Sequence, residues 1–192
     1  HKFIQYQFIK QWYQLKAYAN EQGISIIGDL PIYTAADSVE VWAHPELFEL
    51  NVLNRPAEVA GCPPDCFSAT GQLWGNPVYH WEQHKKTGYA WWIHRLGDVS
   101  KLFDIVRIDH FRGFESYYSI PAKKETAEHG AWMPGPGLEL FQAAQQKLGD
   151  PNILAEDLGH ITPQVRKLLA ETGYPGMKVL QFAFDSDTDN EF

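Results

Sequence analysis

Cysteine is scarce in this sequence of 192 residues, which holds only two. That number is too small for the disulfide framework of a small secreted domain. Cys62 and Cys66 form a C-x-x-x-C spacing with no neighbouring His or Cys pair, so no zinc site is expected. We therefore interpret both as reduced thiols, which predicts a cytoplasmic protein.

Basic clusters and long apolar runs are also lacking. The formal net charge is −8, which argues against nucleic acid and against anionic membrane surfaces as partners. No apolar run reaches the ~18 residues that a membrane helix needs. Aromatic residues, by contrast, are plentiful at 14%, which excludes a disordered chain. The sequence begins without Met and stops soon after a strand-like run, so we expect a piece of a longer protein.

Helical and strand-like patterns alternate along the chain. Helical spacing predicts helices over about 4–19, 89–103 and 140–148, and one that opens at Thr162-Pro163 and ends at Gly173. Strands are expected at 24–27, 104–111, 152–155 and 177–184. The first helix is expected to turn its aromatic stripe towards a core. The order predicts an α/β fold with a parallel sheet, either doubly wound or a (β/α)8 barrel.

Three successive strands finish in a carboxylate, namely Asp29, Asp109 and Glu156. Active sites of parallel α/β folds collect at the carboxyl ends of the strands. Arg107 lies two residues before Asp109 and so shares its face of the strand, where its charge would lower the pKa of Asp109. A purely structural ion pair is an equally open interpretation.

Two chemistries use such carboxylates: cleavage of a glycosidic bond and a divalent metal site in a barrel enzyme. Arg107 opposes a metal, because its positive charge competes with a cation. The segment 61–81 favours sugar, because pyranose rings stack on aromatic side chains while their hydroxyls bond to polar ones. It supplies Asp65, Phe67, Gln72, Trp74 and Tyr79. A self-packed surface loop remains an alternative for this segment.

The sequence around these residues resembles a known family. IVRIDHFRGFE resembles the nucleophile segment of the α-amylase clan, and in particular that of amylomaltases, the 4-α-glucanotransferases or disproportionating enzymes. IIGDLPIYTAADSVEVW, GCPPDCFSATGQLWGNPVYHW and ILAEDLG are similar to that family's other signatures, in its order and spacing. The resemblance covers essentially the whole chain, and PPD-x-FS-x-x-GQLWG-x-P is specific to amylomaltases within the clan.

The resemblance implies both a fold and a catalytic pair. Residues 1–192 would be part of a catalytic (β/α)8 TIM barrel, about strands 3 to 6, with a substrate-cleft insertion at about 44–88. Asp109 matches the family's nucleophile and Glu156 its general acid/base. Arg107 matches the arginine beside the nucleophile, and Asp29 an aspartate at the end of the third strand. A third carboxylate is expected past the end of this sequence.

The resemblance also implies substrate contacts. Phe67, Gln72 and Trp74 match the loop that covers the family's cleft, and Asp65 belongs to the same segment. His110 could bond to a sugar hydroxyl or support a neighbouring group, and both options stay open. Asp157 is expected to cap a helix or support a neighbour. Five other histidines show no metal-ligand spacing and are expected at the surface: His44, His80, His84, His94 and His129.

The implied activity is that of a retaining 4-α-glucanotransferase, which moves α-1,4-glucan segments between maltooligosaccharides through a covalent glycosyl-enzyme. No cofactor or metal is implied. The alternatives are an α-glucan hydrolase of the α-amylase type and a non-catalytic glucan-binding scaffold. GQLWGNP favours transfer over hydrolysis, and the presence of both Asp109 and Glu156 favours an enzyme over a scaffold.

Overall fold

A parallel sheet forms the centre of the chain. The structure is a computed structural model that describes residues 1–66 and 68–184. The sheet has three strands in the order β1-β4-β7, all parallel: β1 (Ile27–Pro31), β4 (Ile105–Asp109) and β7 (Ile153–Ala155). Sheet order thus follows chain order, and the parallel pairing confirms the parallel sheet that the alternating pattern predicts.

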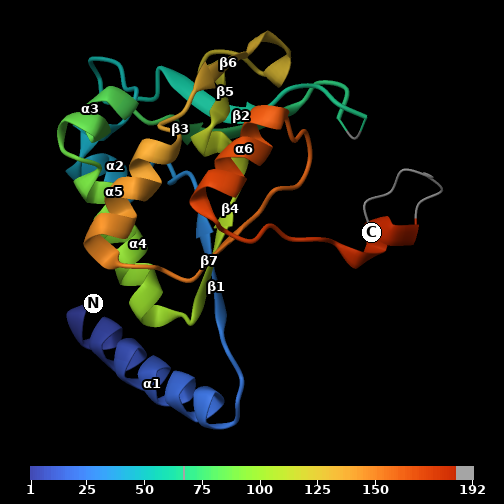
Figure 1. The fold of residues 1–192 in the computed structure, drawn as a ribbon. Helices are drawn as coiled ribbons and strands as arrows, with labels where there is room; N and C mark the ends of the chain where they lie inside the picture. Colours follow the sequence, from blue (N-terminus) through green and yellow to red (C-terminus); the bar gives the residue numbers. More distant parts are fainter. Residues whose placement is uncertain (67, 185–192) are drawn as a thin grey trace.

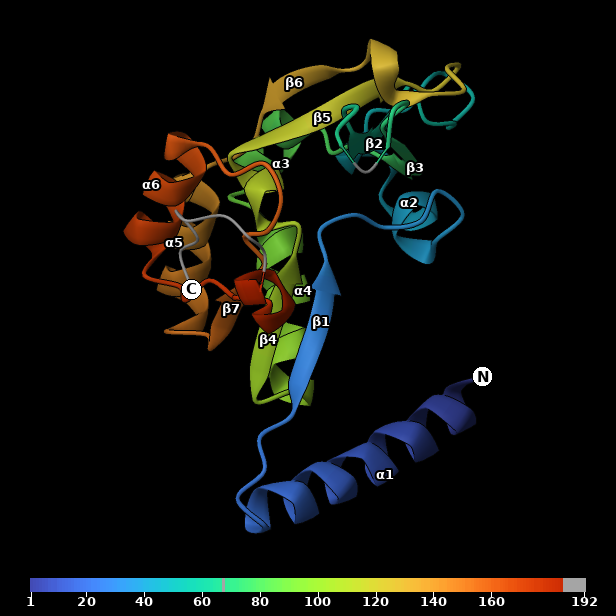
Figure 2. The same cartoon turned by 90° about the vertical axis from the view of Figure 1, so that its right-hand side faces the viewer.

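Three helices pack along this sheet (Figures 1 and 2). They are α4 (Ala90–Leu102), α5 (Leu138–Leu148) and α6 (Pro163–Thr172). Each buries one apolar stripe, such as Trp92 and Leu96 on α4, which confirms the helical periodicity. Thr162 caps α6 by accepting the Val165 N–H at 3.3 Å, and Gly173 ends it in the left-handed region at φ 71°, as predicted.

A second sheet, which is antiparallel, lies beyond the carboxyl ends of the parallel strands (Figure 1). Its order is β3-β2-β5-β6: β2 (Glu58–Cys62), β3 (Gln72–Pro77), β5 (Ser116–Pro121) and β6 (Ala131–Pro134). The sequence interpretation of 61–81 as a long loop is therefore wrong for β3. A Cβ on Gly61 would lie 2.1 Å from the Gln72 carbonyl oxygen, so only glycine allows the two strands this approach.

The connections hold short helices. These are α2 (Val39–Ala43), α3 (Trp81–Lys86) and the 3-10 turns η1 (Pro45–Leu47), η2 (Phe111–Phe114), η3 (Ala127–His129) and η4 (Leu180–Phe184). None of the described helices is long and apolar enough to cross a membrane.

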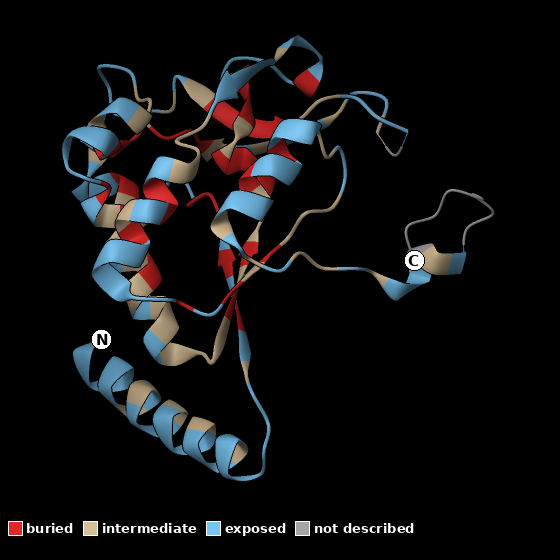
Figure 3. Ribbon diagram, viewed as in Figure 1, coloured by how far each residue is buried: buried red, intermediate tan, exposed pale blue. Residues whose placement is uncertain are grey.

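The core fills the space between α4, α5 and the two sheets (Figure 3). Tyr79, Trp92 and Phe114 are among its fully buried side chains, and their rings contact one another or a shared neighbour. His84 of α3 is also fully buried, so its expected place at the surface is wrong. It sits against Tyr79, and one ring nitrogen, Nε2, is 3.1 Å from the Leu47 carbonyl oxygen.

The first helix, α1 (Lys2–Glu21), differs from its expectation. It buries no residue, and Ile4 and Phe8 are 68% and 58% exposed. Trp12 attaches it by donating to the Leu102 carbonyl at 2.9 Å and by an edge contact with Phe103. The expected core-facing stripe is therefore wrong for the described residues, because the end of α4 covers only the middle of the helix (Figure 3).

Two strand predictions also need correction. The first strand begins at Ile27 rather than Ile24, because the Ile26 N–H donates to the Asp104 carboxylate at 2.7 Å instead of joining the ladder. No strand forms over 177–184, where the chain turns into η4. The Ala155 N–H of β7 donates to the Pro175 carbonyl at 2.9 Å, just before this region, but within the described residues no ladder continues from there, as a strand would require.

Candidate active site

Two of the three predicted carboxylates share one arginine. Arg107 pairs with Asp29 across the β1–β4 register and bonds to its Oδ1 at 2.5 Å. Its other terminal nitrogen bonds to Asp109 Oδ1 at 2.8 Å. Burial lowers the pKa of Arg107, but its bonds to these two carboxylates and their charges raise it, with a net rise. The arrangement places the guanidinium between the two carboxylates, Asp29 and Asp109.

Glu156 follows β7 and reaches the same edge of the sheet. Its Oε2 accepts the His110 N–H at 2.8 Å, and its Oε1 accepts the Leu158 N–H at 2.8 Å. The pKa of Glu156 is raised, first by burial and also by the charge of Asp109, although the two backbone bonds oppose the rise. A carboxyl group with a raised pKa is suited to donating a proton.

His110 links these two carboxylates. Its backbone is left-handed at φ 55°, which turns its N–H towards Glu156 directly after Asp109. Burial, and next the charge of Arg112, lower the pKa of its ring to about 4, so the ring is neutral at neutral pH. The ring meets Trp74 edge-on at 4.8 Å, and in the described part of the chain its buried Nε2 has no hydrogen-bond partner.

His110 lines two hollows among the described residues. The first, of about 390 Å³, is lined by Asp109, Trp74 and Tyr33 among others, and we call it the Asp109 pocket. The second, of about 480 Å³, contains Glu156, and we call it the Glu156 pocket. Its walls also include Asp65, Gln72, His110, Arg112, Trp132 and His160.

The predicted substrate residues therefore divide between two neighbouring pockets. Trp74 lies with Asp109, while Asp65 and Gln72 lie with Glu156. The Trp74 indole donates to the Gln72 side chain at 3.0 Å, which connects the two groups. Phe67, which was predicted to contact substrate, lies outside the described residues.

Sequence reasoning missed part of the lining. Arg112 belongs to the recognised IDHFRGF segment, yet its position in that segment does not reveal that its side chain turns into the Glu156 pocket. Trp132 lies on β6, in a segment for which the sequence pattern predicted no strand. Asp157, in turn, accepts the Met177 N–H at 2.9 Å.

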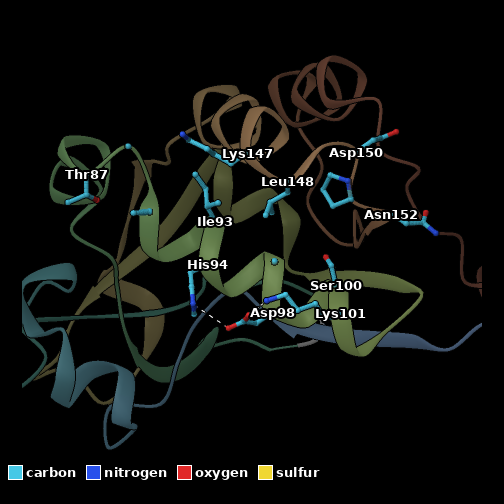
Figure 4. A pocket seen from close by; sticks show the side chains of 14 residues that line it. Thr87, Ile93, His94, Asp98, Ser100, Lys101, Lys147, Leu148, Asp150 and Asn152 are labelled. Atoms are coloured by element: carbon cyan, nitrogen blue, oxygen red, sulfur yellow. Dashed lines mark hydrogen bonds and ion pairs between the residues drawn. The ribbon is translucent and has the colours of Figure 1, made fainter. Parts of the chain in front are cut away.

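Another hollow, of about 850 Å³, lies on the outer side of α4 and α5 (Figure 4). It is lined by residues such as Ile93, Leu148 and Asn152, and by none of the three strand-end carboxylates. His94 and Asp98 pair at its rim at 3.2 Å (Figure 4). Across residues 1–66 and 68–184, no group of three or more His, Cys, Asp or Glu side chains is placed to hold a metal ion.

Comparison with known proteins gives consistent matches. A family model described as 4-alpha-glucanotransferase matches residues 1–192. The chain is 56% identical over 190 residues to the 4-alpha-glucanotransferase of Streptococcus pneumoniae, and this match covers 99% of the chain and 38% of the relative. It is 58% identical over 194 residues to that of Synechocystis sp., covering 100% of this chain and 38% of the relative.

Solved structures agree with the sequence relatives. The amylomaltase from Streptococcus agalactiae in complex with acarbose has a TM-score of 0.94 and 52% identity, and the match covers 97% of this chain and 38% of that chain. The amylomaltase from Corynebacterium glutamicum shares the fold, with a TM-score of 0.81 and 21% identity. That match covers 98% of this chain and 26% of the other chain. This chain therefore spans about two fifths of the length of the curated relatives named above.

Proposed function

The chain belongs to the 4-alpha-glucanotransferase family, and from that premise we propose that the complete protein is a retaining 4-α-glucanotransferase. It would move α-1,4-glucan segments between maltooligosaccharides. The observation that carries this proposal is the placement of Asp109 and Glu156 in two pockets that share His110 as a lining residue. Two carboxyl groups at one strand edge, one beside a cation and one with a raised pKa, suit double displacement at a sugar carbon.

The first step makes the glycosyl-enzyme. Asp109, which bonds to Arg107, attacks the anomeric carbon of the donor glucan, and the bond to the leaving glucan oxygen breaks. Protonated Glu156 gives its proton to that oxygen, so the leaving chain departs with a free hydroxyl group. The raised pKa of Glu156 keeps the proton available for this step.

The second step reverses the roles. Glu156, now a carboxylate, takes the proton from the 4-hydroxyl of an acceptor glucan, and that oxygen attacks the anomeric carbon and releases Asp109. Retention by this route needs the two carboxyl groups to be about 5–5.5 Å apart. Transfer exceeds hydrolysis when sugar rather than water occupies the acceptor site.

The two pockets support a division of labour. The Asp109 pocket, with Trp74, would hold the donor ring that becomes covalently bound. The Glu156 pocket, with Asp65 and Gln72, would hold the leaving or accepting glucan. Aromatic and hydrogen-bonding side chains are present in both, as stacking on sugar faces and recognition of hydroxyl groups require.

The larger architecture is part of the same proposal. Residues 1–192 would supply about strands 3 to 6 of a (β/α)8 barrel, which the sequential parallel order β1-β4-β7 supports. The insertion at about 44–88 would include β2 and β3 and cover the cleft. A cytoplasmic location is supported by Cys62 and Cys66, both of which are free.

Replacing Asp109 by Asn tests the nucleophile. In the complete protein we expect the D109N change to lower disproportionation of maltotriose by several orders of magnitude, because the covalent route is lost, while glucan binding persists. Asp98→Asn, on the outer face of α4, is the matched control and should keep its activity. Near-normal turnover by D109N would contradict the assignment.

A further inference from the structure

Arg112 is a buried charge that the proposed mechanism does not use. It lies in η2, three residues after Asp109, and only 4% of it is exposed. Burial lowers the pKa of Arg112, while the charge of Glu115 raises it, but a guanidinium stays protonated in proteins. Burying a charge is costly unless polar partners compensate it, so this placement calls for a reason.

The guanidinium joins three separate segments. Its Nη1 donates to the His160 carbonyl at 2.7 Å, and its Nη2 donates to Ser116 Oγ at 2.9 Å. Its Cζ lies 3.8 Å from the centre of the Trp132 ring. Arg112 therefore connects the loop after β7, the start of β5 and the strand β6.

Those contacts form the wall of the Glu156 pocket. Trp132 and His160 both line it, and His160 belongs to the loop that continues from Glu156 itself. A planar guanidinium can hold a carbonyl group, a hydroxyl group and an aromatic face in fixed directions at once, whereas a lysine ammonium cannot. The remaining Nε is buried without a partner in the part of the chain that the structure describes.

We propose that Arg112 is a positioning residue that shapes the acceptor side of the site and thereby directs the glycosyl-enzyme towards glucan instead of water. The inference rests on the proposed function. Arg112 touches no reacting atom and acts through Trp132 and His160. Loosening this wall weakens the fit of the acceptor sugar and admits water, while attack by Asp109 on a donor with a small leaving group needs neither wall residue.

The test compares Arg112→Lys with the unaltered complete protein. Maltosyl fluoride serves as donor, because fluoride leaves the Glu156 pocket free of sugar, and maltose serves as acceptor. We expect R112K to raise the KM for maltose and the ratio of hydrolysis to transfer by about tenfold or more. The initial burst of fluoride, which reports formation of the glycosyl-enzyme, should change by less than about threefold.

Two further variants separate positioning from general stability. Arg95→Lys is the matched control, because Arg95 also stacks on Trp residues and bonds to the Pro31 carbonyl, yet it lines neither pocket. It should lower the melting temperature without changing the ratio of hydrolysis to transfer. Trp132→Leu keeps Arg112 but removes the aromatic ring, so it should repeat the shift in the ratio of hydrolysis to transfer. If R112K does not fold, this variant tests the role of Arg112 in its place.

The outcomes are distinct. An unchanged KM for maltose and an unchanged ratio in folded R112K, or in W132L should R112K not fold, would overturn the role of Arg112 alone. An equal loss of the fluoride burst and of transfer would show a general structural role and would also overturn it. No transfer by the unaltered complete protein would refute the proposed function, and the role of Arg112 with it.

Discussion

At the scale of single residues, the two central carboxyl groups differ in what surrounds them. Asp109 bonds directly to the guanidinium of Arg107, whereas Glu156 is partly buried and bonds to two backbone N–H groups. The raised pKa of Glu156 means that its protonated form, and with it the proposed general-acid catalysis, persists to a higher pH than for an ordinary carboxyl and is lost as pH rises through that pKa. This contrast supports the two roles that we propose.

Glu156→Gln tests that assignment. We expect the variant to lose most of its activity on maltotriose, which needs a proton for the leaving oxygen, but to react still with maltosyl fluoride, which hardly needs one. The glycosyl-enzyme should then accumulate on Asp109, where mass spectrometry of a protease digest would detect it. An adduct on another residue, or none, would count against both roles; D109N, treated in the same way, should carry no adduct.

At the scale of elements, α3 carries a titratable group into the core. Burial lowers the pKa of His84 to about 4 from its ordinary value of 6.5, and the charge of His80 adds to the effect. Because the folded pKa is below the unfolded one, protonation favours the unfolded chain. The contribution of neutral His84 to the free energy of unfolding is thus complete above about pH 6.5. It falls by an amount on the order of 3 kcal/mol as the pH drops towards about 4.

His84→Gln should remove much of this pH dependence. Urea unfolding of the complete protein at pH 7 and pH 5 would measure it: the unaltered protein should lose more stability between the two than H84Q does. His110, with a similarly lowered pKa, contributes in the same direction and should leave some dependence in the variant. His129→Gln, at an exposed position, is the control. Equal pH dependence in H84Q and the unaltered protein would show that His84 is not the group responsible.

At the scale of the whole molecule, large apolar surfaces of the described residues lack a cover. Phe3 and Tyr18 of α1 are 71% and 62% exposed, and β1 forms one edge of the parallel sheet (Figures 1 and 3). Exposed apolar faces and free strand edges favour association between chains. The relatives are more than twice as long, and in the barrel that we propose the further strands and helices would cover these surfaces.

Residues 1–192 expressed alone should therefore not disproportionate maltooligosaccharides. The third carboxylate that the family resemblance implies lies outside them, and the uncovered faces should promote aggregation. Chain redistribution and glucose release from maltotriose, measured beside the complete protein, would check this, with light scattering to report association. Comparable specific activity in the short piece would show that the other strands are dispensable.

Local patterns in the sequence determined much of this protein. The cap at Thr162, the stop at Gly173 and the stripes of α4 and α5 depend on residues a few positions apart, and each was predicted correctly. The carboxylates at the strand ends were predicted as a group for a different reason. Parallel strands bring their carboxyl ends to one edge of the sheet.

Tertiary structure alone decided the rest. The antiparallel sheet, the burial of His84 and the place of Arg112 in the pocket wall all depend on partners far along the chain, such as Leu47 for His84 and His160 for Arg112. The same is true of α1, whose stripe predicts a helix but cannot specify what it packs against. A local pattern records which face of an element is apolar or polar, but the partner of that face is selected only when distant segments meet.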